Sequence, residues 1–475
     1  DRKGFIQNSP NPTHCGLYLI RVKASCIMRV TSEDILHGPV KETLVRMTGP
    51  MIIAIFSMML FGAVDTFFIS LMGTDPLAAI SFTFPVTFTI MNLSIGMGIA
   101  TSVILAQIIG RREMQTAQRV CTDALWFSTL LVVIVAALGL LTIDPLFRAL
   151  GATDNTLPFI REYMVIWYLA VGLLVIPMTG NAAIRATGDT KWPSILMMAS
   201  GVINAILDPF LIFGIGPFPE MGVQGAALAT AISWAIGFVF ALWLLGAREK
   251  LLTWRPPNLA ELKSTWGQLL RIGSPISLAN MLTPITILFL TALVARFGET
   301  AVAGYGAGGR IEAFAMVVAF AMTSTLSPFM AQNIGAGNVT RARQALNGSL
   351  KFIFVLQLVA YMLLAIAAPL LTGVFSQDPA VLLVANQYLW IMPAGACFYA
   401  LVIVIATAFN AAQESNKTLL SSLVRLFIFI LPCAFLGGLL LDIPGLFLGS
   451  VVGNMLAAVF SFWLVNRMMD RLEAK

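Results

Sequence analysis

Long apolar runs recur along this chain from about residue 44 to its end, and they constrain its fold more than any other feature. Each run is near or above the roughly 18 residues that a helix needs to cross a bilayer. Only 11% of the residues are charged, whereas a soluble domain holds about 25%. The sequence therefore predicts an all-α membrane protein with twelve transmembrane helices. We expect them at 44–72, 78–109, 121–143, 159–183, 192–215, 223–246, 266–295, 301–333, 346–374, 382–409, 417–441 and 445–467.

Basic residues are concentrated in every second loop, which predicts how the chain crosses the membrane. The loops after the second, fourth, sixth, eighth and tenth helices contain Arg111, Arg112, Arg119, Arg185, Lys191, Arg248, Lys250, Arg255, Lys263, Arg341, Arg343 and Lys417. The alternate loops are mainly acidic, with residues such as Asp75, Asp154 and Glu220. Because cytoplasmic loops carry the excess of Lys and Arg, we expect a multi-pass protein of the inner membrane with both termini in the cytoplasm.

The second half of the chain repeats the first half at an offset of 225 residues. The matched positions are, in chain order, Pro50 with Pro275, Ala106-Gln107 with Ala331-Gln332, Gly110 with Gly335, and Tyr163 with Tyr388. Six helices per half is an even number, so both halves enter the membrane from the same side and form a parallel repeat. We expect two parallel-repeat six-helix lobes, at 41–247 and 266–475, joined by a cytoplasmic linker at 248–265.

Residues 1–40 differ from the rest of the chain because they are polar and contain Pro and Asn. We expect them to form an N-terminal extension outside the membrane fold. The sequence begins at Asp1, and Met28 is a candidate start. If Met28 is the start, residues 1–27 are not native, so no fold prediction is based on this segment.

Several classes of function lack the residues that they need. The two histidines, His14 and His37, precede the first helix, and the five cysteines show no paired spacing. We therefore expect no metal site, no disulfide and no Ser-His-Asp triad. No Gly-rich loop ends in Gly-Lys-Ser/Thr, which excludes ATP hydrolysis by a P-loop. The basic residues form no face interleaved with aromatic residues for nucleic acid. We expect no enzyme activity, no catalytic residue and no cofactor, and an ion gradient as the energy source.

Two carboxylates interrupt the apolar helices, Asp65 in the first and Asp208 in the fifth. A charge at the centre of a membrane helix costs about 2.5–3.5 kcal/mol, so its presence favours a function. Each aspartate lies eight residues before a glycine that starts an outer loop, Gly73 or Gly216. Both carboxylates would therefore lie about 12 Å below the outer end of their helices. The alternative is a buried polar pair that only holds helices together.

Asn204 lies one helical turn before Asp208, which places both side chains on one face of the fifth helix. Pro209 lacks an N–H and leaves the carbonyl of Ala205 without its helical partner. A carboxylate, an amide oxygen and a free carbonyl are ligands that suit a proton or a hard cation such as sodium. For Asn204 alone, a hydrogen bond between helices is the alternative.

The repeat allows a test of these acids within the sequence. In the second half, Leu290 occupies the position of Asp65 and Cys433 occupies the position of Asp208. If the acids were needed for the fold of a lobe, both copies should carry them. Their asymmetry favours a cation site in the first lobe.

Three further features have both a structural and a functional interpretation. Pro50 and Pro275 lie early in the first helix of each half and would permit a bend, with a static kink as the alternative. Asn181 closes the fourth helix and would either face the same cavity or simply end the helix. Arg310 would pair with Glu312 or reach the outer interface, and a role in substrate binding is the less favoured alternative.

Together these features resemble the multidrug and toxic compound extrusion (MATE) family, within its DinF-like branch. The resemblance covers about residues 41–470. It rests on the six-plus-six parallel lobes, on Pro50, on the acidic first helix, on the segment Gly180-Asn181-Ala182-Ala183-Ile184-Arg185-Ala186-Thr187-Gly188-Asp189, and on Asn204 and Asp208 followed by Pro209.

The resemblance implies a cation-coupled multidrug efflux antiporter that exports organic, often cationic, compounds by alternating access. It implies that Asp65, Asn181, Asn204 and Asp208 form the cation site and that Pro50 is the bending point of the first helix. The acidic cation site of the other bacterial branch lies in the C-terminal lobe and is not evident here. This difference favours H⁺ over Na⁺ as the coupling ion. The expected partners are small organic substrates and the lipid bilayer, without nucleic acid, and we expect a monomer.

Other functions need features that the sequence supplies weakly or not at all. A lipid or oligosaccharide flippase of the same superfamily needs several basic residues in its cavity for phosphate groups, and Arg310 and Arg425 are the candidates. A membrane-embedded enzyme needs a nucleophile, base or metal constellation. A simple channel is a third alternative, and the broken symmetry of the two halves disfavours it.

Overall fold

The computed structural model describes residues 30–255, 258–374 and 377–474, and nearly all of them are helical. The candidate start Met28 and most of the predicted N-terminal extension lie outside the described residues.

The first half of the chain forms six long helices. They are α3 (Val40–Ser70), α4 (Thr74–Gly110), α5 (Met114–Ala149), α6 (Leu157–Ala186), α7 (Lys191–Phe213) and α8 (Gly222–Trp243), which a π-helical turn, η1 (Leu244–Arg248), extends. Each is long and apolar enough to cross a membrane. A helix suits such a segment because it satisfies every backbone hydrogen bond within the segment, where lipid offers none.

The second half forms the matching set with more interruptions. It contains α9 (Leu259–Val294), η2 (Ala295–Phe297), α10 (Glu299–Ala315), α11 (Val317–Gly335), α12 (Val339–Thr372), α13 (Pro379–Ala411), α14 (Ser415–Leu423), η3 (Val424–Ile430) and α15 (Leu431–Glu473). The predicted eighth membrane helix is α10 and α11 together, bent by 44° between them. The predicted eleventh helix contains the π-helical stretch η3.

The number of spans depends on how the last segment is divided. Within the described residues, ten helices qualify as spans, and the bent pair makes an eleventh. The segment Ser415–Glu473 counts once among the ten, but its backbone is not helical at Leu441 and Asp442. A Cβ on Gly437 would lie 2.0 Å from the carbonyl oxygen of Gly445, so the chain folds back on itself there. The segment therefore provides two spans, and the predicted all-α fold with twelve transmembrane helices is confirmed.

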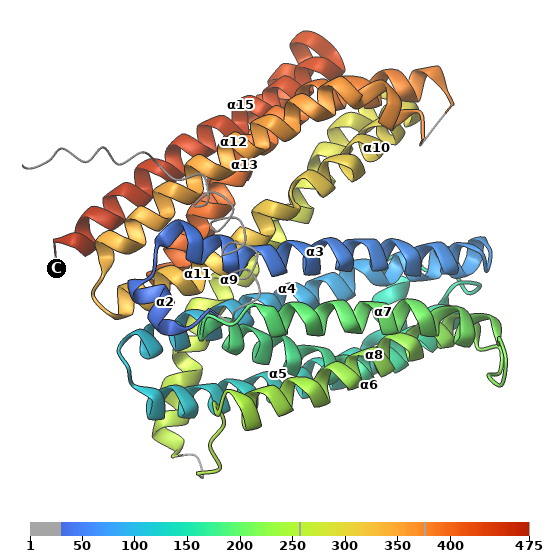
Figure 1. The fold of residues 1–475 in the computed structure, drawn as a ribbon. Helices are drawn as coiled ribbons and strands as arrows, with labels where there is room; N and C mark the ends of the chain where they lie inside the picture. Colours follow the sequence, from blue (N-terminus) through green and yellow to red (C-terminus); the bar gives the residue numbers. More distant parts are fainter. Residues whose placement is uncertain (1–29, 256–257, 375–376, 475) are drawn as a thin grey trace, which may run out of the picture.

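The two halves, α3 to α8 and α9 to α15, lie against each other at one end of the molecule and diverge toward the other end (Figure 1). The C-terminus and α2 (Ser32–His37) lie at the joined end. We call this the basic end, because the loops at 111–113, 187–190, 249–255, 336–338 and 412–414 lie there and most of the basic loop residues are in or beside them. The largest cluster of buried apolar side chains draws on both halves, whereas other clusters belong to one half each.

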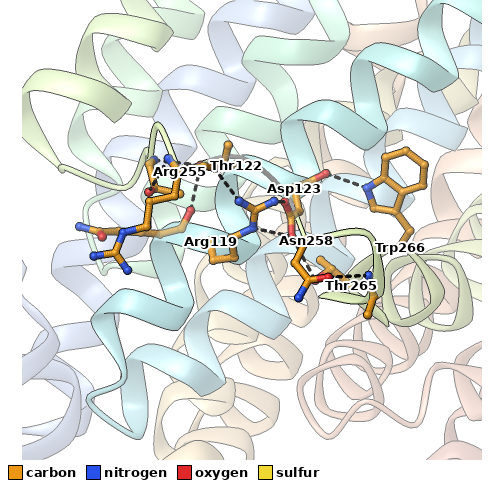
Figure 2. A network of polar contacts seen from close by, with 10 residues as sticks. Arg119, Thr122, Asp123, Arg255, Asn258, Thr265 and Trp266 are labelled. Carbon is orange, nitrogen blue, oxygen red and sulfur yellow. Dashed lines mark hydrogen bonds and ion pairs between the residues drawn. The ribbon is translucent and has the colours of Figure 1, made fainter. Parts of the chain in front are cut away.

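The segment between the halves differs from the predicted linker at 248–265. Asn258 caps α9, which begins at Leu259 and so takes up the second part of that range. Figure 2 shows why this end is fixed: Asp123 of α5 binds Arg119 at 2.6 Å, and its carbonyl oxygen accepts a hydrogen bond from Trp266 of α9 at 3.0 Å. Asp123 is fully buried. The start of α9 is therefore attached to the first half.

A short helix, α2, lies in the segment that we expected to be outside the fold. Thr31 and Asp34 cap it with reciprocal hydrogen bonds, a local pattern that favours a helix start. Ile35 is fully buried, and its carbonyl oxygen accepts hydrogen bonds from Asn333 and Arg341 of the second half. This segment therefore packs against the second half and is not a free extension.

Candidate functional site

Asp65 and Asp208, which the sequence places at one depth, lie together in the structure. Asp65 is on α3 and Asp208 is on α7, and these two helices pack side by side. Their side chains are close enough to interact electrostatically, and Oδ2 of Asp208 has no hydrogen-bond partner among the described residues. Asp208 is fully buried and Asp65 is half-buried. Because a carboxyl group donates a hydrogen bond only when protonated, the pair can hold a proton between the two helices.

Asn204 joins this pair to the neighbouring helix α8. Its Nδ2 lies 3.3 Å from Oδ1 of Asp208 and 3.3 Å from Oγ1 of Thr230. The hydroxyl of Thr230 in turn donates to the carbonyl oxygen of Ala226 at 3.0 Å. Thr230 could not be assigned to this site from the sequence, because a single threonine in an apolar helix forms no pattern with other polar residues. Only the packing of α7 on α8 brings it to the site.

Tyr163 of α6 completes the group. It is half-buried and close enough to interact electrostatically with both Asp65 and Asp208. Four helices, α3, α6, α7 and α8, therefore bring two carboxyl groups, an amide, a hydroxyl and a phenol to one place. Such an oxygen-rich set suits a proton or a hard cation. We call these residues, Asp65, Tyr163, Asn204, Asp208 and Thr230, the acidic site.

The structure does not bring Asn181 to the acidic site. Asn181 and Tyr163 are both on α6, and the 18 residues between them along the helix correspond to about 27 Å. Asn181 is buried, and its Oδ1 has no hydrogen-bond partner among the described residues. It lies toward the basic end, whereas Asp65, five residues from the end of α3, lies toward the opposite end.

Pro50 also lies away from the acidic site, on the same helix as Asp65. It is inside α3 and half-buried. Two residues earlier, Thr48 makes a hydrogen bond of 2.9 Å with Thr325 of α11. Pro50 thus lies between the contact of Thr48 with α11 and the residue Asp65 on the same helix, although Phe56, after Pro50, also packs on Phe314 of the second half.

The second half also contains an acidic group, Glu312, which the sequence suggested only as a partner of Arg310. Glu312 of α10 is close enough to interact electrostatically with Tyr388 of α13 and with Tyr305, and its Oε2 has no hydrogen-bond partner among the described residues. The rings of Tyr305 and Tyr388 meet edge to face, 5.4 Å apart, and both pack on Phe447. The proposed pairing of Glu312 with Arg310 is not among the contacts shown, and Arg310 is exposed.

Arg425 is the other basic residue considered from the sequence. It lies in η3 and is only 6% exposed. Its guanidinium sits 4.4 Å from the ring centre of Tyr399 and binds Oδ1 of Asn454 at 3.2 Å. Tyr399 is eleven residues along α13 from Tyr388, or about 16 Å, and Tyr388 faces the helix of Arg310. The two arginines therefore do not form one basic surface.

The described residues contain no group of three or more His, Cys, Asp or Glu side chains that could hold a metal ion. The acidic site is thus a carboxyl pair with neutral partners. That composition fits a transient cation better than a permanent one, because two carboxylates supply few charged ligands.

Comparison with known proteins gives a consistent result over nearly the whole chain. The MatE family profile matches residues 50–210 and 275–436, one range in each half. A protein named FAD transporter from Shewanella oneidensis is 40% identical over 442 residues, covering 93% of this chain and 98% of that protein. A multidrug export protein, MepA, from Staphylococcus aureus is 24% identical over 436 residues, covering 92% and 95%.

Solved structures agree with these relatives. The bent form of the Vibrio cholerae MATE transporter VcmN is similar to this chain with a TM-score of 0.87 and 30% identity, covering 92% of this chain and 98% of that one. A MOP superfamily transporter from Pyrococcus furiosus gives a TM-score of 0.86 and 26% identity, covering 94% and 99%.

Proposed function

The chain belongs to the multidrug and toxic compound extrusion family of membrane transporters, and from this premise we propose that it is a proton-coupled antiporter that exports organic compounds by alternating access. The observation that carries the proposal is the contact between Asp65 and Asp208, supported by Asn204. Uphill export needs an energy source, and this pair is a place where a coupling ion can bind.

The chemistry of the pair suits exchange of a proton for a cation. When Asp65 and Asp208 share a proton, their mutual hydrogen bond is formed and α3 is tied to α7. A cationic substrate near the pair would favour loss of that proton, and by linkage the proton would weaken substrate binding by the same factor. Proton entry would then drive substrate release. Na⁺ is the alternative ion, because the same oxygens are suitable ligands for it.

The arrangement of the halves supports a state that is closed at the basic end. The halves lie together there and diverge toward the end near which Asp65 lies (Figure 1). We propose that the basic end faces the cytoplasm, since positive loop residues stay inside, and that the membrane is the inner membrane. Export would then require this end to open, take up substrate and close again.

Transport by the purified protein in liposomes tests the coupling ion. A pH gradient and a sodium gradient are imposed separately, and export of a fluorescent organic cation such as ethidium is measured. We expect the pH gradient alone to drive export. Export that follows only the sodium gradient would identify Na⁺ as the coupling ion. Export with neither gradient would refute ion coupling.

Export of FAD is a second candidate, favoured by the 40% identity to a protein named as an FAD transporter. The same liposomes would be tested with FAD, with riboflavin, which lacks phosphate, and with ethidium. Transport of FAD alone would assign a narrow substrate range. Transport of ethidium alone would assign multidrug export and exclude the FAD candidate.

A further inference from the structure

Two glutamines at the basic end join the halves through contacts that the repeat relates to each other. Gln107, near the end of α4, donates from Nε2 to the carbonyl oxygen of Ala411 on α13 at 2.7 Å. Gln332, near the end of α11, donates to the carbonyl oxygen of Ala186 on α6 at 2.5 Å. Donors and acceptors alike are related by the offset of 225 residues, and each bond crosses from one half to the other.

Each of these amides is held in place by a second hydrogen bond to its oxygen. Gln413 donates to Oε1 of Gln107 at 2.8 Å, and Ser32 donates to Oε1 of Gln332 at 2.9 Å. Gln107 is 7% exposed and Gln332 is fully buried. Both the donor and the acceptor of each amide are therefore used, which fixes the direction in which it points.

Two glycines allow the helix ends to approach closely enough for these bonds. A Cβ on Gly110 of α4 would lie 2.2 Å from the carbonyl oxygen of Gln332. A Cβ on Gly335 of α11 would lie 2.3 Å from the carbonyl oxygen of Gln107. No larger residue fits at either position without separating α4 from α11. The backbone of each helix end thus lies directly against the residue that carries the other amide.

We propose that Gln107 and Gln332 form a double lock that keeps the basic end closed and must open in every transport cycle. They are positioning residues, because they act on the relative placement of the halves and not on the transported compound. The inference rests on the alternating-access part of the proposed function. The need to open follows because both glutamine bonds join one half to the other. Contacts within one half can persist through the transport cycle, whereas contacts between the halves at a closed end must break when that end opens.

The lock predicts that removing either amide makes the basic end open more often. Gln107→Met and Gln332→Met keep the side-chain length and remove both hydrogen bonds. The reporter is Thr325→Cys, at a fully buried position on α11 that faces Thr48 of the first half. Its rate of maleimide labelling in nanodiscs, read by mass spectrometry at that site, should rise in each variant by about fivefold for each hydrogen bond lost between the halves, the factor that corresponds to about 1 kcal/mol per bond.

Gln357 provides a matched control. It is 2% exposed and donates to the carbonyl oxygen of Ala315 at 3.0 Å, but both residues belong to the second half. Gln357→Met should leave the labelling rate of the reporter unchanged even if it lowers Tm. An equal rise in this control would show general loosening and would overturn the lock, as would unchanged labelling in both lock variants.

A milder variant keeps the test decisive if the lock variants do not fold. Ser32→Ala removes only the bond that orients Gln332 and should raise the labelling rate by less than Gln332→Met does. Ser32→Thr retains a hydroxyl and should leave the labelling rate unchanged. Unchanged labelling in Ser32→Ala would then count against the lock. Labelling reports opening whether or not a compound is carried, so failure of the lock and failure of the proposed transport are separate results.

Discussion

The two halves of the molecule share a backbone plan but differ in where they carry charge. At the basic end they are nearly interchangeable, since Gln107 and Gln332 make equivalent bonds in opposite directions. Toward the other end, the repeat-related tyrosines Tyr163 and Tyr388 both face carboxyl groups. In the first half the carboxyl groups come from α3 and α7, but in the second half Glu312 comes from α10.

This difference indicates which parts of the duplicated fold can change. The positions equivalent to Asp65 and Asp208 hold Leu290 and Cys433, and Leu290 is buried. The position equivalent to Glu312 holds Thr87, whose hydroxyl bonds to its own helix. Helix packing at the basic end therefore constrains sequence in both copies, whereas the polar groups near the tyrosines do not. An asymmetric pair of sites suits a transporter that must bind an ion and a different molecule.

Neutralising one acid in each half should give the largest difference between the halves. Asp208→Asn keeps the side-chain shape but removes the proton that the pair shares. A pH difference of one unit supplies about 1.4 kcal/mol per proton, so loss of proton coupling should lower the gradient of exported substrate about tenfold at that pH difference. Glu312→Gln keeps an acceptor for Tyr388 and should retain most of the gradient. The measurement is the steady-state substrate ratio across proteoliposomes, and equal losses would assign coupling to both halves.

A reciprocal exchange between the halves should give the next largest effect. Asp65→Leu copies the second half into the first and should fold normally while losing coupling, because it removes a charge from the membrane region. Leu290→Asp places a charge among buried apolar neighbours, which costs about 2.5–3.5 kcal/mol on insertion scales. Its yield and Tm should fall well below those of Asp65→Leu. Comparable yields would mean that the second half accepts an acid at this position.

Most of the fold could be predicted from the sequence because lipid allows few alternatives. The apolar runs, the alternating charge of the loops and the offset of 225 residues led to the twelve helices and the two halves. The break between Ala315 and Val317 and the π-helical stretch in the eleventh helix were not predictable, because neither contains Pro and both depend on packing. Helix α2 was missed because it is short and polar, although Thr31 and Asp34 formed a recognisable cap.

The candidate site was predictable only along single helices. The i, i+4 spacing placed Asn204 with Asp208, and equal depth suggested that Asp65 could meet them. Contacts between helices that are distant in sequence left no signal, so the contacts of Asn204 with Thr230 and of Glu312 with Tyr388 could not be predicted. Asn181 was considered as a residue that ends the fourth helix or faces the same cavity, and the family resemblance then placed it in the cation site. Its distance from Tyr163 along α6 places it toward the basic end instead.

The tyrosines offer a finer test of how the halves differ. Tyr388→Phe removes the hydroxyl of a buried tyrosine that lies beside the carboxyl group of Glu312, and leaving a buried polar group unsatisfied costs about 1–3 kcal/mol. Tyr163→Phe removes a group for which the structure gives electrostatic contact with Asp65 and Asp208. Thermal unfolding in detergent should therefore show a larger fall in Tm for Tyr388→Phe. A larger fall for Tyr163→Phe would reverse this assignment.

The smallest effects concern the two repeat-related prolines, and they separate bending from static packing. Each proline removes one helical hydrogen bond, so replacement by alanine should stiffen the helix by about 1 kcal/mol. Pro275 is buried in α9, where Gly273 packs on Met97 and Ser277 bonds to the carbonyl of Leu93.

Pro50 is half-buried in α3, between the contact of Thr48 with α11 and the carboxyl group of Asp65. We expect α3 to bend at Pro50 as the acidic site gains and loses a proton. Pro50→Ala should then slow export severalfold, because a continuous helix favours one bend state of α3. The Tm of this variant should stay level or rise. Pro275→Ala should change Tm more than export, since α9 is held on both sides of the proline. The measurements are the export rate per folded molecule and Tm of both variants. Equal activity of Pro50→Ala and the unaltered protein would show that the proline is a fixed kink. In that case α3 would transmit no motion from the acidic site to the basic end.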